Sequence, residues 1–405
     1  MKATIRQCWT ALFSVKMSRI YLDNSATTAL CDAAKNAMMR AMECYGNPSS
    51  LHAAGLEAEH MVRKAREQVE AALGVRKGTG TIYFTASGTE ANNLAIMGSV
   101  FAKERLAGKR IVTTEGEHSS VEATLRELEK KGFEVVRIPT KNGVIDMDFA
   151  GKAIDKNTIL VTAMMVNNET GALYDLKSLF ALAKRNAPGV VTHCDAVQGF
   201  MKAIFSPAAI GADLMTISAH KIHGPKGVGA LYVGAEITKA KKLIPIIFGG
   251  GQEQGMRSGT ENVIGIAGFG AAAEQAQSTL RPDLIRMTQL RNYLEQKLAQ
   301  IPEITLNLPG GSRAPHIVNL TLPDIKSETM LNHLSAKEIC VSSGSACASH
   351  GKATSRALAA FGLTPEQADC SLRVSLCAQN TEADIDALCE SLGGAVAALV
   401  RIHRS

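Results

Sequence analysis

The sequence contains no long apolar run, no paired cysteine motif and no basic stripe. No stretch approaches the roughly 18 apolar residues of a membrane-spanning helix, so we expect no membrane role. The nine cysteines include no C-x-x-C pair and are odd in number, which argues against a disulfide framework and against a zinc site. These absences are typical of the reducing cytosol, so the sequence predicts a cytoplasmic protein without a bound metal.

The charge of the chain does not indicate a nucleic-acid ligand. The formal net charge is +6, and Lys and Arg are interleaved with Asp and Glu. With 46% hydrophobic and 20% charged residues, the composition is that of a globular enzyme, and 405 residues suit two domains. The residues before Asp23 include no acid, as in an organellar presequence, but we interpret them as an extension before an alternative start at Met17.

Strand-like runs alternate with helix-like segments over residues 56–235, which predicts an α/β fold with a mostly parallel sheet covered on both faces. The apolar residues of 56–73 recur at helical spacing. Seven runs rich in Val, Ile and Thr are the predicted strands: 81–84, 110–114, 134–138, 159–166, 190–196, 214–219 and 229–233.

The pattern changes near Asn262. A long Ala-rich helix, a charged helix and short strands such as 317–323 and 372–376 predict a smaller α+β domain. The Gly- and Pro-rich stretch 245–259 is the best candidate for the boundary between the two domains.

Lys221 lies just beyond a predicted strand and next to a glycine-rich turn. Loops at strand ends are where open α/β sheets bind ligands. A lysine amine held there can form a Schiff base with an aldehyde if it loses its proton readily. If Lys221 is considered alone, an ordinary surface lysine is the more common explanation of this residue.

Two further strand ends carry suitable groups for such a ligand. Gly88, Thr89 and Glu90 occupy a turn from a strand into a helix, where backbone N–H groups and the helix dipole favour a phosphate. Asp195 ends another strand, with Gln198 three residues later, and a carboxylate there could keep a pyridine nitrogen protonated. Ordinary helix capping would also explain both groups.

Ten short strings in a fixed order make the chain resemble a known family. The resemblance extends from about Ile20 almost to the C-terminus, and the strings are YLDNSATT, GNPSSLH, TASGTEANN, EHSSV, VNNETG, CDAVQ, SAHKIHGPKG, GGGQEQGMRSGTEN, SSGSAC and LRVSL. In this order they resemble the cysteine desulfurases of the class V aminotransferase superfamily. The SSGSAC string is similar to that of the subgroup that supplies sulfur for iron–sulfur clusters and thiolated nucleotides.

The resemblance implies a homodimer of the fold type I pyridoxal-phosphate architecture. A large cofactor-binding domain would span residues 30–258, with a mostly parallel seven-stranded sheet. A small α+β domain would combine residues 1–29 with 259–405.

The resemblance also implies how pyridoxal 5'-phosphate would be bound. Lys221 would hold the cofactor through its amine, Asp195 would pair with the pyridine nitrogen and Gln198 would hydrogen-bond the ring oxygen. The phosphate would be held at the turn of Gly88 and Thr89 and by Ser218 and His220, and Thr260 would reach the phosphate in the partner subunit.

The catalytic roles follow from the same resemblance. His118 would lie over the ring face as an acid and base, while Asn168 and Arg373 would bind the carboxylate of L-cysteine. The thiolate of Cys347 would attack the substrate sulfur and keep it as a persulfide, leaving L-alanine. The interval after Cys347 is shorter than in other members, so the acceptor could be a cluster scaffold, a thiolation factor or a dedicated partner.

Two other functions are compatible with parts of the pattern. A selenocysteine lyase or another class V enzyme, such as an aminotransferase, would share Lys221 and Asp195. A protein that keeps the fold only as a scaffold for a sulfur-accepting partner would have no physical need for the full set of catalytic residues.

Overall fold

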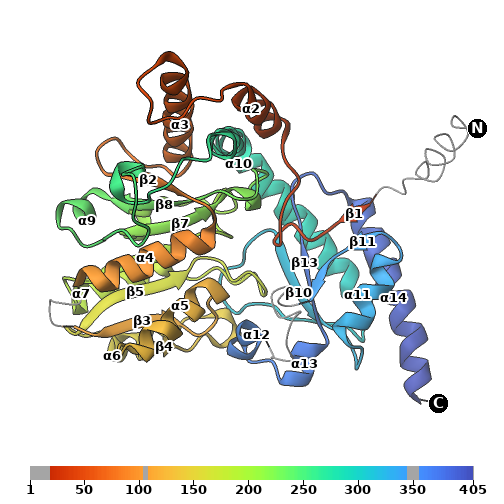
Figure 1. Cartoon of the computed structure of the whole chain (residues 1–405). Helices are drawn as coiled ribbons and strands as arrows, with labels where there is room; N and C mark the ends of the chain where they lie inside the picture. The colour runs from red at the N-terminus through yellow and green to blue at the C-terminus, as the bar shows by residue number, and fades with distance from the viewer. Residues whose placement is uncertain (1–18, 104–107, 344–354, 405) are drawn as a thin grey trace, which may run out of the picture.

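The computed structural model describes residues 19–103, 108–343 and 355–404 (Figure 1). A large sheet covered by helices forms one part of the molecule, and a smaller α+β part lies beside it. None of the helices in these ranges combines the length and apolar character needed to cross a membrane.

The large sheet has seven strands in the order β2-β8-β7-β6-β5-β3-β4. Only β8 runs antiparallel to its two neighbours, so the predicted mostly parallel sheet is confirmed. Each predicted run forms a strand: β2 Gly80–Thr85, β3 Arg110–Thr114, β4 Glu134–Ile138, β5 Thr158–Met164, β6 Val191–Asp195, β7 Leu214–Ser218 and β8 Gly229–Gly234.

Helices cover both faces of this sheet, as the alternating pattern predicts. Leu160 packs on the face covered by α4 and α5, which lie in front of the sheet in Figure 1, and Val161 packs on the opposite face with α3, α7 and α10. The helices of this part are α2 Asp32–Glu43, α3 Ala53–Ala72, α4 Gly88–Lys103, α5 Ser119–Lys130, α6 Met147–Ala153, α7 Leu176–Asn186, α8 Pro207–Ile210 and α9 Ala235–Lys239. Strands buried on both faces read as nearly continuous apolar runs, which is why the sequence revealed them.

The small part joins the two ends of the described chain. Its antiparallel sheet has the order β12-β13-β10-β9, and β1 (Ile20–Tyr21) pairs in parallel with β11 (Ile339–Cys340). The remaining strands are β9 Thr305–Leu306, β10 Ile317–Thr321, β12 Ser342–Ser343 and β13 Ser371–Ser375. The helices are α11 Ser327–Ser335, α12 Arg356–Phe361, α13 Pro365–Asp369 and α14 Glu382–Arg404.

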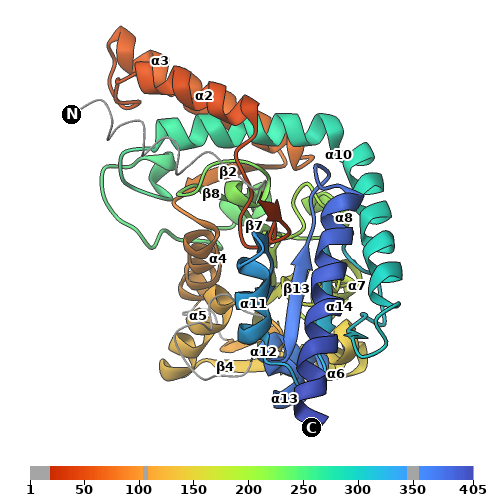
Figure 2. The same ribbon diagram turned by 90° about the vertical axis from the view of Figure 1, so that its right-hand side faces the viewer.

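One long helix, α10 (Val263–Leu298), connects the two parts. The sequence predicts two helices here, and that prediction is wrong, because residues 263–298 form a single helix. Figure 2 shows α10 crossing the large part and then turning down beside α14; Pro282, which lies inside the helix, accounts for the bend. Phe269 packs in the core of the large part and Leu294 in that of the small part, so a division at residue 259 stays a prediction.

Candidate active site

A cavity of about 570 Å³ opens where the carboxyl ends of five strands meet the small part. Its walls come from the loops after β2, β3, β5, β6 and β7, from residues 25–26 and from segments of the C-terminal region. The cavity brings together ten of the predicted site residues: Gly88, Thr89, His118, Asn168, Asp195, Gln198, Ser218, His220, Lys221 and Arg373.

The two remaining predicted site residues are Thr260 and Cys347. Thr260 is exposed and does not line the cavity, so its predicted action on a partner subunit stays a prediction. Cys347 lies outside the described residues.

Lys221 reaches the cavity because it ends a short 3-10 turn, Ala219–Lys221, directly after β7. Its Nζ donates to the carbonyl oxygen of Ser25 at 2.5 Å and to that of Ala26 at 2.9 Å. The N-terminal segment therefore orients the amine that is expected to hold the cofactor.

Asp195 is buried at the end of β6, and two hydrogen bonds orient its carboxylate. Oδ2 accepts from Nδ2 of Asn92 at 2.8 Å, and Oδ1 accepts from the backbone N–H of Val197 at 3.0 Å. Nδ2 of Asn92 also donates to Ser120 Oγ at 2.8 Å, so one amide connects Asp195 to the first turn of α5, which His118 caps. No role of Asn92 was predicted from the sequence, although this residue lies in the TASGTEANN string.

His118 caps the N-terminus of α5. Its Nδ1 accepts from the backbone N–H of Ser120 at 3.2 Å and lies 2.8 Å from Ser120 Oγ. Since Ser120 engages Nδ1, Nε2 is the ring nitrogen that can exchange a proton with a bound substrate. Burial lowers the pKa of His118 and Asp195 opposes this shift, so the surroundings favour the neutral imidazole.

The residues around the start of α4 suit a phosphate group. A Cβ atom at Gly88 would lie 2.9 Å from Val197 Cγ2, so this turn has no room for a side chain. Ser218 Oγ is buried and has no hydrogen-bond partner among the described residues. Burial, with Lys221 as the next cause, lowers the pKa of His220 to about 4. Backbone N–H groups at a helix N-terminus, a hydroxyl and a neutral imidazole are fitting partners for a phosphate.

Arg373 and Asn168 lie together at another part of the wall. Nη1 of Arg373 donates to the backbone oxygen of Asn168 at 2.9 Å, and Nη2 donates to Asp23 Oδ1 at 2.7 Å. The Arg373 side chain is only 3% exposed. A buried guanidinium at a cavity wall is suited to bind a carboxylate.

Gln198 lines the cavity, and two contacts fix its side-chain amide. Its Nε2 donates to the carbonyl oxygen of Ser25 at 2.8 Å, and Oε1 lies 3.4 Å from Nε2 of the buried His316. The predicted contact of Gln198 with the ring oxygen of the cofactor stays a prediction.

Lys202 is a buried amine that the sequence analysis missed. Within the described part of the chain, no acceptor lies within hydrogen-bonding distance of its Nζ. Burial, followed by the charge of Lys221, lowers the pKa of Lys202 to about 7. No local pattern distinguishes Lys202 from a surface lysine, because its burial comes from packing between distant segments.

Replacing Lys202 with methionine is expected to change how stability depends on pH. Between pH 7 and the usual lysine pKa of 10.5, the unfolded chain binds a proton that the folded chain does not, so this group makes folding more favourable as pH rises. Lys202→Met should therefore raise the melting temperature most at pH 6, with the gain shrinking towards pH 10. Thermal melts of Lys202→Met and of the exposed control Lys226→Met test this, and a gain independent of pH would contradict it.

An amine, a buried carboxylate and groups suited to a phosphate around one cavity are typical of pyridoxal-phosphate enzymes. The family profile of Aminotransferase class-V matches residues 20–388, so the chain belongs to this family, for which pyridoxal phosphate is the cofactor. The chemistry of the residues described above fits this cofactor, because the cavity offers the amine of Lys221, the carboxylate of Asp195 and the unpartnered hydroxyl of Ser218.

Individual relatives carry a more particular name. The chain is 39% identical over 370 residues to cysteine desulfurase IscS of Dictyoglomus turgidum, covering 91% of this chain and 92% of the relative. It is 40% identical over 377 residues to a cysteine desulfurase of Trichormus azollae, covering 92% of each. A solved NifS-like protein superimposes with a TM-score of 0.86 at 35% identity, covering 94% of this chain and 99% of that protein.

Proposed function

We propose that this protein is a pyridoxal-phosphate-dependent cysteine desulfurase, which converts L-cysteine to L-alanine and transfers the sulfur to an acceptor. The observation that carries this proposal is one cavity lined by Lys221, Asp195, His118 and Arg373. Relatives named cysteine desulfurase over more than nine-tenths of the chain support the choice of substrate.

Each side chain has a distinct task in this reaction. When bound, the cofactor supplies an electron sink for the substrate α carbon. Asp195 keeps a proton on the ring nitrogen, Arg373 binds the substrate carboxylate, and Lys221 and His118 Nε2 move protons at the α carbon and at the sulfur. The Cys347 thiolate forms a bond to the substrate sulfur as the carbon–sulfur bond breaks. The electron pair of the broken carbon–sulfur bond stays on carbon, and protonation of that carbon gives L-alanine.

The decisive assay measures both products of the purified protein. We expect equal amounts of L-alanine and sulfide from L-cysteine with a thiol reductant. A strong preference for L-selenocysteine, or amino transfer that requires a keto acid, would favour another class V activity. A protein that binds no pyridoxal phosphate, even when it is added, would be a scaffold instead.

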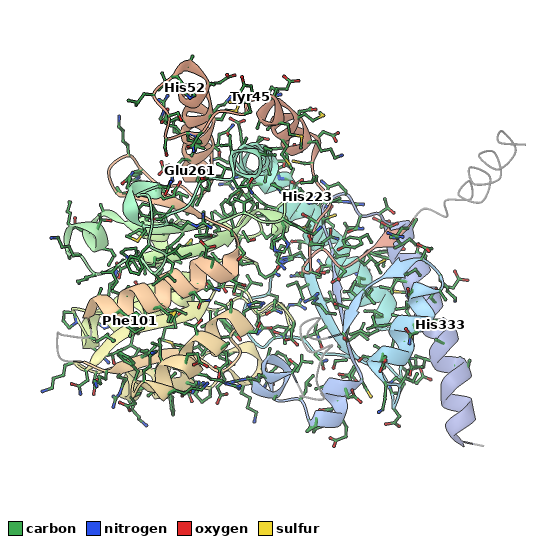
Figure 3. The ribbon with its side chains drawn as sticks, viewed as in Figure 1. Tyr45, His52, Phe101, His223, Glu261 and His333 are labelled. Atoms are coloured by element: carbon green, nitrogen blue, oxygen red, sulfur yellow. The ribbon has the colours of Figure 1, made fainter. Side chains whose placement is uncertain are left out.

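We also infer a homodimer. Apolar side chains are strongly exposed on the arm formed by α2, α3 and their connection, where Tyr45 is 94% and Leu51 91% exposed. Figure 3 places Tyr45 and His52 at the same end of the molecule as Glu261, the neighbour of Thr260. A second copy covering this end would bury these side chains and bring Thr260 towards a phosphate in the other subunit.

Charges placed on the arm should dissociate this dimer. Each apolar side chain buried at an interface contributes about 1.5–3 kcal/mol, so Tyr45→Asp with Leu51→Asp should raise the dimer dissociation constant at least about 100-fold. Sedimentation velocity measures this, with Leu308→Asp, a partly exposed leucine of the small part, as the control. An unchanged dimer would show that the arm is not the interface, and a monomeric wild type would contradict the homodimer itself.

The acceptor and the compartment complete the proposal. A persulfide on Cys347 needs a protein that takes the sulfur, either a cluster scaffold or a thiolation factor. A thiol that must be regenerated at every turnover works in a reducing compartment, and we place the protein in the cytoplasm.

A further inference from the structure

The LDNSA part of the first motif contacts two of the basic side chains that line the cavity, Lys221 and Arg373, although no role was predicted for it from the sequence. Asp23 Oδ1 accepts from Arg373 Nη2 at 2.7 Å. Two residues further along, the backbone oxygens of Ser25 and Ala26 accept from Lys221 Nζ. One short segment thus touches the residue expected to bind the substrate carboxylate and the residue expected to hold the cofactor.

Backbone pairing fixes this segment along β13. The N–H of Ser375 donates to the carbonyl oxygen of Leu22 at 2.7 Å, and the N–H of Asn24 donates to that of Ser375 at 3.1 Å. The N–H of Ser25 donates to Ser375 Oγ at 2.8 Å. Since Arg373 lies two residues before Ser375 on the same strand, this register determines where the Asp23 carboxylate meets the guanidinium.

The buried surroundings of Arg373 leave the Asp23 carboxylate as its main counter-charge. A guanidinium that is 3% exposed requires a counter-charge, because an unpaired buried charge is costly. Of the nearby charged groups, Lys202 and Lys221 carry the same sign as Arg373. Burial raises the pKa of the Glu169 carboxyl, which weakens it as a counter-charge. Asp23 is therefore the principal partner of Arg373 within the described ranges.

The pairing also leaves donors of the guanidinium unused. Nη1 is held by the Asn168 carbonyl and Nη2 by Asp23, whereas the buried Nε has no partner in the ranges that the structure describes. A guanidinium anchored at two atoms keeps a fixed plane, and its remaining N–H groups keep a fixed direction. Such preorganisation lowers the entropy cost of binding a carboxylate.

We propose that Asp23 is a positioning residue for substrate binding: it holds Arg373 so that the unused N–H groups of the guanidinium meet the α-carboxylate of the amino acid. This inference rests on the proposed function. Asp23 acts through Arg373 and takes no part in proton transfer or in the breaking of the carbon–sulfur bond.

The test replaces Asp23 by asparagine and by serine in the cofactor-loaded protein, with Asp32→Asn as a control at an exposed aspartate of α2. L-alanine, the product, serves as the probe, and its dissociation constant is read from the change in visible absorption of the bound cofactor. We expect both Asp23 variants to bind L-alanine at least tenfold more weakly, and to raise KM for L-cysteine similarly, with kcat within about threefold of wild type. Asp32→Asn should match wild type.

The opposite results are equally clear. If the Asp23 variants bind L-alanine as tightly as wild type, or more tightly, Asp23 does not position Arg373 and the inference fails. A fall in kcat with unchanged affinity would also overturn it. Circular dichroism and the cofactor absorption show which Asp23 variants are folded. One folded variant is enough for the test. If wild type releases no sulfide, the proposed function fails. The inference on Asp23 is judged separately, by the ratio of the dissociation constants of variant and wild type for L-alanine.

Discussion

Lys221→Ala is expected to reduce sulfide release from L-cysteine by more than about 10³-fold, because the variant loses both the covalent attachment of the cofactor and a group that moves protons. The position of Lys221 at the end of β7, with its amine held by two backbone oxygens in the cavity, is the basis for this expectation. Borohydride reduction followed by peptide mass spectrometry should find the cofactor on the Lys221 peptide of wild type and on no peptide of the variant.

Lys226→Ala is the matched control, since Lys226 is an exposed lysine of the same glycine-containing loop. It should keep the covalently fixed cofactor and nearly full activity. Lys202 provides the strictest alternative, because its amine is buried, its pKa is lowered to about 7 and the charge of Lys221 acts on it. Cofactor fixed on Lys202 in the wild-type protein would contradict the assignment of Lys221.

Cys347→Ser should lower sulfide release at least about 10²-fold and leave the visible absorption of the bound cofactor unchanged. A serine hydroxyl is a far weaker nucleophile towards sulfur than a thiolate, whereas none of the groups expected to bind the cofactor is altered. Steady-state sulfide production and an absorption spectrum measure the two properties separately. Mass spectrometry of wild type treated with L-cysteine should show an added sulfur atom on the Cys347 peptide.

Cys370→Ser is the control for this experiment. Cys370 is a half-buried thiol at the end of α13 that does not line the cavity, so its replacement should leave sulfide release nearly unchanged. Full turnover by Cys347→Ser, or loss of turnover in Cys370→Ser together with added sulfur on Cys370, would show that the sulfur goes to a different residue.

The features that the sequence predicted well are those with a local cause. The strands of the large sheet are apolar runs because they are buried on both faces. The cavity follows from the same pattern, since Asp195 and Lys221 come just at or after strand ends and parallel strands end at one edge of the sheet.

The features that were missed depend on packing between distant parts of the chain. Asp23 and Arg373 are separated by 350 positions, and no periodicity connects them. Lys202 is 6% exposed, and the charged groups that act on it include Lys221 and Arg373, which are distant in the sequence. The prediction of two helices in place of α10 was wrong for a related reason. A change in composition suggested two helices, but each half of a single helix buries its apolar face in a different core.

The pairing of residues 22–25 with β13 has a consequence for biosynthesis. Asp23 leaves the ribosome well before Arg373, which follows it by 350 positions. Although the large sheet can begin to fold during translation, Asp23 has no partner and the carbonyls of Ser25 and Ala26 have no fixed position until β13 has been made. Capture of the cofactor by a correctly shaped site is therefore an event that follows the synthesis of β13.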